Sequence, residues 1–327
     1  MKARGRVLLT GGAGFIGSHL AEALLQRGQY EVSIVDSLDD FYAPWRKRAN
    51  LAEVGKVGAV ALFDTDLCDA VALREVFQQV KPEIVIHLAA RAGVRPSIEQ
   101  PLLYERVNVA GTSNLLEIAR EFGVERFIFG SSSSVYGATS RVPFSENDPV
   151  MRPISPYAAT KLAGELMCHT YAHLYRFTII CLRFFTVYGP RQRPDLAIHK
   201  FTSLLEAGKQ IPIFGDGSMG RDYTYVDDIV AGVLASLDYN PQGDLPFDIL
   251  NLGNSHPIKL VELIKHLEAA TGRKAILKYQ ALQPGDVPIT WANIEKARQR
   301  LGYEPTMKLD RGLERFVTWY RSNALAT

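Results

Sequence analysis

The sequence predicts an α/β protein built on a doubly wound parallel β-sheet, with a smaller C-terminal substrate lobe intertwined with it. Short, continuous apolar segments alternate with longer helical segments up to about residue 185, as buried parallel strands alternate with covering helices. The first of these strands runs directly into a glycine-rich turn. A chain of 327 residues is long enough for one large sheet and a second lobe.

The composition is that of an ordinary globular protein, with 47% apolar and 22% charged residues. The formal net charge of +2 gives no reason to expect nucleic acid as a partner. The apolar stretch 177–188 contains Arg183 and is too short to span a bilayer, and the N-terminal apolar run is too short for a signal peptide. Cys68, Cys168 and Cys181 lack metal-ligand or redox spacing. We therefore expect a soluble, cytoplasmic protein with reduced cysteines, no metal site and no membrane segment.

A predicted strand over 6–10 is followed by three regularly spaced glycines and a helix over 18–27. Gly11 permits a tight turn, Gly14 lets the backbone approach a pyrophosphate, and Gly17 allows close packing of helix on strand. The helix N-terminus would offer N–H groups and a positive dipole end to phosphates. We expect a dinucleotide site here, and a purely structural turn is the alternative.

A second strand over 31–35 ends at Asp36, about 20 residues beyond the glycines, where an acid typically binds the ribose hydroxyls of NAD. The charge of Asp36 would repel the 2′-phosphate of NADP, and no Arg follows it directly, so NAD is favoured. The alternative is a simple turn residue. Residues 38–50 are expected to form a loop and a short helix.

A third strand over 58–63 precedes Asp66 and Leu67, which could face the adenine of a cofactor. Asp66 could equally be the N-cap of a helix over 70–80, and both roles can hold. A fourth strand is predicted over 83–88.

Ala89 and Ala90 follow the fourth strand, and such small residues would let the backbone lie against the cofactor. His87, inside the apolar strand, is expected to be a core residue rather than a ligand. A long helix is predicted over 97–122, with Asn108 in its middle, where Asn is unfavourable. Asn108 could hold a water, bend the helix near the active site, or face solvent.

A fifth strand over 126–129 leads into four serines, 131–134, and then a Val-Tyr-Gly segment. Hydroxyls at the carboxyl end of a parallel strand lie where ligands bind in open α/β sheets. A low-complexity linker is the alternative, and the position directly after a strand disfavours it.

The next helix, 156–175, carries Tyr157 and Lys161 one turn apart on one face. Ser155 suits the N-cap position, and the proline after it suits the first helical position. An ammonium group near a phenol favours the phenolate, so Lys161 is expected to lower the pKa of Tyr157 towards working pH. By itself, the pair also fits an ordinary surface helix. A sixth strand follows over 178–183.

The chain changes character after the sixth strand. An irregular segment, 185–195, and a glycine-rich segment, 215–223, contain Arg191, Arg193 and Arg221, whose guanidinium groups could clamp phosphates or a carboxylate. The later elements are expected to be helices over 198–207, from 227, and over 259–271, 294–301 and 309–321, with strands over 249–252 and 275–279. We assign the dinucleotide-binding (Rossmann) domain to 1–185 with 224–255, and the substrate lobe to 186–223 with 256–327.

These motifs resemble those of the extended short-chain dehydrogenase/reductase family, and more narrowly those of its nucleotide-sugar epimerases. The matching segments are the glycine turn 11–17, Asp36, His87-Leu88-Ala89-Ala90, the serine run with Val135-Tyr136-Gly137, Tyr157-x-x-x-Lys161, Leu182-Arg183-Phe184-Phe185 and Arg221-Asp222-Tyr223. The resemblance covers essentially the whole chain. It implies NAD as the cofactor, and a homodimer formed through the helices 97–122 and 156–175.

The resemblance also implies a mechanism for a UDP-sugar 4-epimerase. Tyr157, as a phenolate, would take the proton from the C4 hydroxyl while NAD⁺ oxidises C4 to a transient ketone, which is then reduced on its other face. Ser132 holds the place of the family's catalytic Ser or Thr, and Lys161 would bind the nicotinamide ribose. The implied cofactor contacts are Gly11, Gly14, Phe15, Ile16, Gly17, Asp36, Asp66, Leu67, Ala89, Ala90, Asn108, Tyr157, Lys161 and Phe184.

The serine loop bears on which related reaction is implied. Similar 4,6-dehydratases carry an Asp-Glu pair in this loop, and nucleotide-glucuronate decarboxylases carry a Glu, where this chain has Ser133 and Ser134. Epimerisation is therefore favoured over both. The segment 184–195 looks most like UDP-glucuronate 4-epimerases, in which the serine loop, Thr186 and Arg193 would surround the sugar carboxylate.

The closest alternative is the UDP-glucose/UDP-galactose pair, although epimerases of that kind more often have Asn in place of Thr186. A nucleotide-sugar reductase, and a non-catalytic NAD-binding protein, are further alternatives. The segment 281–286 lacks an Arg that some relatives use for the diphosphate, which would leave more of that task to Arg221. The implied substrate contacts are Arg95, Ser133, Ser134, Thr186, Arg191, Arg193, Arg221 and Asp286.

Overall fold

The structure, a computed structural model, describes residues 5–138, 141–281 and 287–324. Its largest feature is a seven-stranded sheet in the order β10-β6-β5-β4-β1-β2-β3, in which every neighbouring pair is parallel. The strands are β1 (Gly5–Thr10), β2 (Tyr30–Val35), β3 (Ala61–Phe63), β4 (Ile84–His87), β5 (Arg126–Ser132), β6 (Thr178–Phe184) and β10 (Phe247–Leu252). The predicted doubly wound parallel sheet is confirmed.

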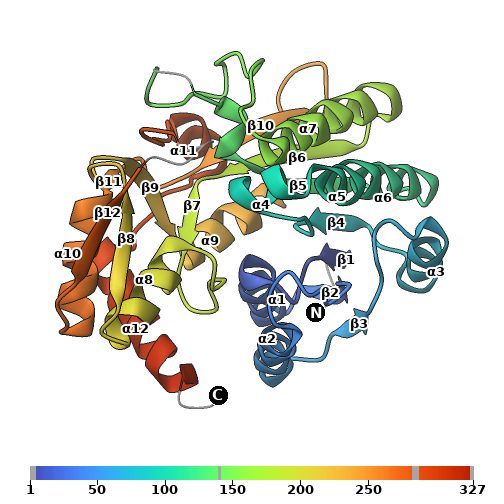
Figure 1. The fold of residues 1–327 in the computed structure, drawn as a ribbon. Helices are drawn as coiled ribbons and strands as arrows, with labels where there is room; N and C mark the ends of the chain where they lie inside the picture. The colour runs from blue at the N-terminus through green and yellow to red at the C-terminus, as the bar shows by residue number, and fades with distance from the viewer. Residues whose placement is uncertain (1–4, 139–140, 282–286, 325–327) are drawn as a thin grey trace.

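Helices cover both faces of this sheet, because successive side chains of each strand point to opposite faces and are apolar on both. Leu9 packs in the same hydrophobic cluster as Leu24, whereas its neighbour Leu8 packs in the other cluster with Phe77. Figure 1 shows the two layers of helices on either side of the sheet. They are α1 (Phe15–Arg27), α2 (Pro44–Val57) and α9 (Val226–Ser236) on one face, and α3 (Ala70–Val80), α6 (Gly111–Glu121) and α7 (Pro156–Tyr175) on the other.

A second group of elements lies beside the large sheet (Figure 1). One small sheet has the order β11-β9-β7 and the other pairs β12 with β8. The strands of this second group are β7 (Thr186–Tyr188), β8 (Gln210–Phe214), β9 (Gly220–Tyr225), β11 (Pro257–Lys259) and β12 (Ile276–Gln280), and its helices are α8 (Ala197–Glu206), α10 (Leu260–Thr271) and α12 (Leu309–Ala324). Helix α11 (Glu295–Leu301) instead packs against β10 of the large sheet and against α9. Because β7 follows β6 almost directly and β9 runs into α9, the chain passes repeatedly between the two groups. Within the described residues, no helix combines the length and apolarity needed to cross a bilayer.

Helix α2 is longer than the sequence predicts. It begins at Pro44 and ends at Val57, whereas the expectation is a loop and a short helix over 38–50. Its buried residues are Lys47, Asn50 and Val54. Since only one of these is apolar, hydrophobic periodicity gives little signal for this helix. The strand that follows is correspondingly short, with β3 covering only three residues.

The N-cap of α3 is Asp69, and the alternative that assigns this cap to Asp66 is wrong. The Asp69 carboxylate accepts hydrogen bonds from the N–H groups of Val71 at 3.1 Å and Ala72 at 3.0 Å. The Asp66 carboxylate instead accepts from the Cys68 N–H at 2.9 Å, in the turn before the helix. Asp66 is therefore a turn residue, which leaves its predicted position near the cofactor open.

The predicted helix 97–122 is interrupted in the structure. It consists of α4 (Val94–Glu99), α5 (Pro101–Glu105), a π-helical turn η1 (Arg106–Ala110) and α6. Pro101 has no N–H to continue α4, so it begins a new helix. Asn108, in the π-helical turn, is buried, so the alternative in which it faces solvent is wrong. A break in the helix at this residue agrees with the alternative in which Asn108 bends it.

Candidate active site

A cavity of about 780 Å³ lies where the large sheet meets the second group of elements, and most of the predicted site residues line it. Those residues are Gly11, Gly14, Phe15, Ile16, Gly17, Asp36, Asp66, Leu67, Ala89, Ala90, Arg95, Ser132, Ser133, Ser134, Tyr157, Lys161, Phe184, Thr186, Arg193 and Arg221. The cavity collects them from the carboxyl ends of β1, β2, β4, β5 and β6 and from the loops beyond. This is where open parallel sheets bind their ligands.

Backbone atoms lie so close to the glycine turn that two of its positions leave no room for a side chain. A Cβ on Gly11 would lie 2.7 Å from the Ala89 nitrogen, and a Cβ on Gly17 would lie 2.1 Å from the Gly11 carbonyl oxygen. Gly11 also has a φ of +73°, which favours glycine. Helix α1 starts just beyond, and its N-cap, Gly14, carries no side chain that could cover the first N–H groups. The turn therefore fits the pyrophosphate of a dinucleotide.

Asp36 is buried at the end of β2, and its carboxylate is held in place by its neighbours. It accepts hydrogen bonds from the Leu38 N–H at 2.9 Å and the Ala13 N–H at 3.1 Å. Burial raises the pKa of Asp36, and the charge of Lys47, 3.8 Å away, opposes that rise. A fixed carboxylate at this position can accept hydrogen bonds from the hydroxyls of a ribose.

Lys161 projects from α7 towards the end of β5. Its Nζ donates a hydrogen bond of 2.7 Å to the Gly130 carbonyl and lies 5.0 Å from the centre of the Phe129 ring. Burial lowers the pKa of Lys161 to about 8. Helix α7 begins as predicted, since Ser155 Oγ accepts a hydrogen bond from the Ala158 N–H at 3.1 Å.

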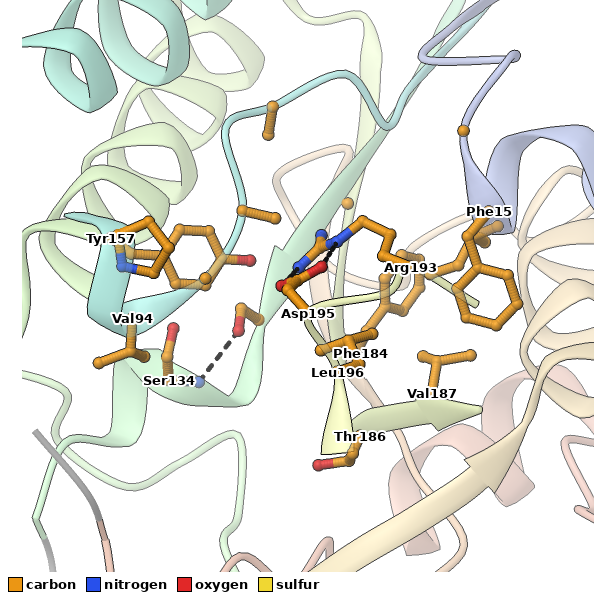
Figure 2. A pocket seen from close by; sticks show the side chains of 18 of the residues that line it. Phe15, Val94, Ser134, Tyr157, Phe184, Thr186, Val187, Arg193, Asp195 and Leu196 are labelled. Atoms are coloured by element: carbon orange, nitrogen blue, oxygen red, sulfur yellow. Dashed lines mark hydrogen bonds and ion pairs between the residues drawn. The ribbon is translucent and has the colours of Figure 1, made fainter. Parts of the chain in front are cut away.

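Tyr157 lies one turn before Lys161, and its hydroxyl points into the cavity (Figure 2). Burial raises the pKa of Tyr157, while a hydrogen bond with Ser132 and the charge of Arg193 oppose that rise. The expectation that Lys161 brings the pKa of Tyr157 down is therefore wrong for this structure. The physical reason is that removing a phenolate from water outweighs the favourable contacts, and the cation that acts on it is Arg193.

The serine loop continues β5 as a short 3₁₀ turn, η2 (Ser133–Tyr136). Ser132 Oγ accepts a hydrogen bond of 3.2 Å from the Ser134 N–H (Figure 2). The Ser134 hydroxyl is buried and has no hydrogen-bond partner among the described residues. A buried, unpaired hydroxyl is unfavourable, and this one lines the cavity, where it can donate a hydrogen bond to a polar group of a ligand.

Two of the three predicted clamp arginines line the cavity, and the third does not. Arg193 forms a bidentate ion pair with Asp195, and Arg221 Nη1 donates to the Gly220 and Val287 carbonyls at 2.8 Å each. Arg191 instead donates to Ser18 and to Glu22 of α1 and is not among the lining residues. Its guanidinium is therefore not positioned for the predicted role in substrate binding.

Asn108 is also absent from the cavity lining and lies behind it. Its Nδ2 donates to the Arg91 carbonyl at 2.9 Å and to Thr160 Oγ1 at 3.0 Å. The side chain thus joins the π-helical turn to the helix that carries Tyr157, and it acts on the site indirectly rather than as a cofactor contact. His87 is buried among strand residues, as predicted, with its ring nitrogens 2.8 and 2.9 Å from threonine hydroxyls. Asp286 lies outside the described residues.

Sequence reasoning missed a charged and aromatic group beside the cavity. Lys47 Nζ lies 3.1 Å from the Asp39 carboxylate, and Arg91 Nε lies 3.2 Å from the same group. The Phe41 ring lies under the guanidinium groups of both Arg91, at 5.5 Å, and Arg193, at 5.3 Å. Local sequence shows only a polar and aromatic loop after Asp36, and nothing in it indicates that these residues meet Arg193.

The glycine turn after β1, the acid after β2, and Tyr157 and Lys161 beside Ser132 define a site of the short-chain dehydrogenase/reductase class. The sequence model of the GDP-mannose 4,6 dehydratase family matches residues 8–316, and the chain belongs to this family. Within the described residues, no group of three or more His, Cys, Asp or Glu side chains could hold a metal ion.

Relatives of known name are similar over nearly the whole chain. A UDP-glucuronate 4-epimerase of Thermodesulfobacterium geofontis is 43% identical over 98% of this chain and 97% of its own length. UDP-glucuronate 4-epimerase 1 of Arabidopsis thaliana is 44% identical over 97% of this chain and 76% of its own length. Protein CapI of Staphylococcus aureus is 41% identical over 96% of this chain and 98% of its own length.

Solved structures show the same likeness. The UDP-glucuronic acid 4-epimerase of Bacillus cereus, in complex with UDP-glucuronic acid and NAD, superposes with a TM-score of 0.90 at 35% identity, covering 97% of this chain and 99% of that one. The UDP-glucose 4-epimerase of Thermotoga maritima, with UDP-glucose, gives a TM-score of 0.88 at 33% identity, covering 98% and 99%. The fold alone therefore does not choose between the two sugar pairs.

Proposed function

We propose that this protein is an NAD-dependent UDP-sugar 4-epimerase that interconverts UDP-glucuronate and UDP-galacturonate. The observation that carries the choice of sugar is the wall formed by Ser134, Thr186 and Arg193 in the cavity that also holds Tyr157. It offers an unpaired buried hydroxyl and a guanidinium group, which suit a carboxylate. The serine loop contributes no carboxylate of its own, which disfavours a dehydratase or a decarboxylase.

The residues present fit the cofactor. We propose that Gly11, Gly14 and Gly17 hold the pyrophosphate and that Asp36 holds the adenosine ribose, so residues 1–185 with 224–255 form the NAD-binding part. Residues 186–223 with 256–327 would bind the UDP-sugar. Bound NAD⁺ supplies the reversible oxidation of a sugar carbinol to a ketone.

The chain's own residues perform the acid–base part of this reaction. Tyr157, as a phenolate, accepts the proton of the C4 hydroxyl and returns it when the ketone is reduced. Ser132, whose hydroxyl lies in the same cavity and opposes the rise in the pKa of Tyr157, holds the reacting oxygen in place. A cation in the same cavity, Arg193, favours the phenolate that the burial of Tyr157 disfavours. Besides this proton transfer and the reversible oxidation that NAD⁺ supplies, epimerisation requires the ketone to turn in the cavity before it is reduced on its other face.

A product assay tests the proposal. The purified protein is incubated with UDP-glucuronate, and the products are separated by anion-exchange chromatography and identified by NMR. UDP-galacturonate is expected, and Tyr157→Phe should abolish its formation. Conversion of UDP-glucose to UDP-galactose, without conversion of the uronate, would instead favour the second candidate, which the Thermotoga maritima structure represents.

We further propose a homodimer in which α4, α5, α6 and α7 of one protomer pack against the same helices of the other. Four apolar residues on these helices are exposed in the chain by itself: Ile98 by 46%, Leu102 by 81%, Leu166 by 62% and Leu174 by 59%. Apolar side chains gathered on neighbouring helices are typical of a surface that a partner covers. Light scattering on the wild type and on Leu166→Glu tests this, because the charge should shift the population to monomer.

A further inference from the structure

Arg193 and Asp195 form an ion pair inside the cavity, two residues apart in the chain. Nε of Arg193 lies 3.0 Å from Oδ1 of Asp195, and Nη2 lies 2.8 Å from Oδ2. Both residues line the cavity, and their side chains are 17% and 39% exposed. Figure 2 shows the pair between Tyr157 and Phe15, with Phe184 and Leu196 beside it.

The guanidinium of Arg193 stands in surroundings where a counter-charge is needed. The Phe41 ring lies 5.3 Å from its Cζ, so one side of the group faces an aromatic surface rather than water. A cation that is largely removed from water is unfavourable unless an anion and hydrogen-bond acceptors accompany it. Asp195 supplies both in the ligand-free protein, with a geometry that matches the fork of the guanidinium group.

A sugar carboxylate has the same shape and charge as the Asp195 carboxylate. In the proposed function, Arg193 binds the carboxylate of the uronate, so the two anions compete for one guanidinium. With a neutral sugar no second anion arrives, and Arg193 keeps its partner. An Arg193 that is paired with Asp195 therefore binds uronates less tightly than an unpaired Arg193 would. The binding of neutral sugars is not weakened in this way.

We propose that Asp195 is the resident counter-ion of Arg193 and that it sets how strongly the enzyme distinguishes anionic from neutral UDP-sugars. This inference rests on the proposed function. A different role for Asp195, in which it only orients Arg193 towards the substrate, has the opposite consequence. An orienting residue would strengthen uronate binding, whereas a competing counter-ion weakens it.

The sign of the change in selectivity distinguishes the two roles. Dissociation constants of UDP-glucuronate and UDP-glucose are measured by titration calorimetry on the NAD-loaded protein, with Tyr157→Phe in every variant to prevent turnover. The selectivity is the Kd of UDP-glucose divided by the Kd of UDP-glucuronate. Asp195→Asn should raise this ratio roughly tenfold, mainly through tighter uronate binding. Asp195→Glu, which keeps the charge, should stay near the wild-type ratio, and Arg193→Met should bring the ratio down towards one.

The matched control is Asp227→Asn, which removes the carboxylate of another Arg–Asp pair. Asp227 lies 3.6 Å from Arg315, outside the cavity lining, with both side chains more than half exposed. The selectivity ratio of Asp227→Asn should equal that of the protein that carries Tyr157→Phe alone, which is the wild-type reference in this experiment. Asp195 is itself partly exposed and caps no helix, so Asp195→Asn should fold, which circular dichroism and NAD binding verify.

Each outcome supports or overturns the inference. A raised ratio in Asp195→Asn supports it. An unchanged or lowered ratio in Asp195→Asn, with a wild-type ratio well above one, overturns the inference and leaves the proposed function standing. A wild-type ratio near one that Arg193→Met does not change overturns both.

Discussion

Arg183 of β6 and Glu165 of α7 form a bidentate ion pair that is almost completely buried, with side chains 2% and 3% exposed. Arg183 Nε and Nη2 donate to the two carboxylate oxygens at 2.9 and 2.8 Å. The Ser131 hydroxyl donates to the same carboxylate at 2.5 Å. Glu165 therefore connects the helix that carries Tyr157 with the strand that carries Ser132.

Breaking this pair should be strongly destabilising. Glu165→Gln leaves the Arg183 charge buried without its hydrogen-bonded carboxylate, and the loss of one partner of a buried pair typically costs about 3–5 kcal/mol. Urea unfolding followed by circular dichroism measures this loss. The control is Glu314→Gln, which removes a partner of Arg311 in a pair exposed by 75% and 54%, where less than about 1 kcal/mol is expected. Equal effects of the two substitutions would contradict the assignment.

Gly17→Ala should prevent cofactor binding. The added Cβ would lie 2.1 Å from the Gly11 carbonyl oxygen and 2.8 Å from the Gly11 carbonyl carbon, so the backbone of the turn must move. Fluorescence titration with NAD should show no saturable binding. Gly55→Ala is the matched control, because Gly55 lies exposed within α2 and its Cβ would meet no atom within 4 Å. That variant should bind NAD normally and gain up to about 1 kcal/mol of stability. Normal NAD binding by Gly17→Ala would rule out the proposed pyrophosphate site.

The sequence predicts the strand–turn–helix around Gly11 and the placing of Tyr157 and Lys161, because local rules govern both. Apolar strands, glycine spacing and helical periodicity are each visible within a few residues. The π-helical turn at Asn108 was not predictable in detail, since the partners that stabilise it, Arg91 and Thr160, are distant in sequence or on another helix.

The pairs Arg191–Glu22 and Arg193–Asp195 show a second limit. Both arginines lie in one loop, and nothing in the sequence distinguishes which of them reaches the substrate. Only the path of the chain places Arg191 against α1 and Arg193 in the cavity. The pKa of Tyr157 likewise depends on its burial and on the charge of Arg193, and the tertiary structure determines both.

Asp36→Asn should weaken NAD binding. The Asp36 carboxylate accepts hydrogen bonds from the Ala13 and Leu38 N–H groups and still has oxygen lone pairs for the hydroxyls of a ribose. The amide of Asn is uncharged and has one acceptor oxygen instead of two, so it would accept weaker hydrogen bonds. A hydrogen bond to a charged group contributes about 1.5–3 kcal/mol, so the Kd of NAD should rise roughly 10- to 100-fold. Titration calorimetry on cofactor-free protein measures it. Asp39→Asn, on the same loop, serves as the comparison, because its carboxylate is engaged by Lys47 and should change the Kd less. An unchanged Kd in Asp36→Asn would show that the ribose lies elsewhere.

Lys161 should make the stability of the cofactor-free protein rise with pH in the alkaline range. Burial lowers the pKa of its ammonium group from the usual 10.5 to about 8 in the folded protein. Between these two values the unfolded chain binds more protons than the folded protein, so the free energy of unfolding increases with pH. Below about pH 8 both states carry the charge, and the penalty of burying it is fully present.

Lys161→Met removes this titration and keeps most of the side chain's volume. The free energy of unfolding of the wild type minus that of Lys161→Met should rise by about 1.6 kcal/mol between pH 8 and 9.5, since each unit of pKa shift corresponds to about 1.4 kcal/mol and the group is half deprotonated at pH 8 in the folded protein. Urea unfolding of cofactor-free protein at several pH values measures the difference. Groups that titrate in this range without interacting with Lys161 contribute equally to both proteins and cancel. A difference that stays constant from pH 8 to 9.5 would mean that Lys161 keeps its proton, held by the Gly130 carbonyl 2.7 Å away more strongly than its burial disfavours the charge.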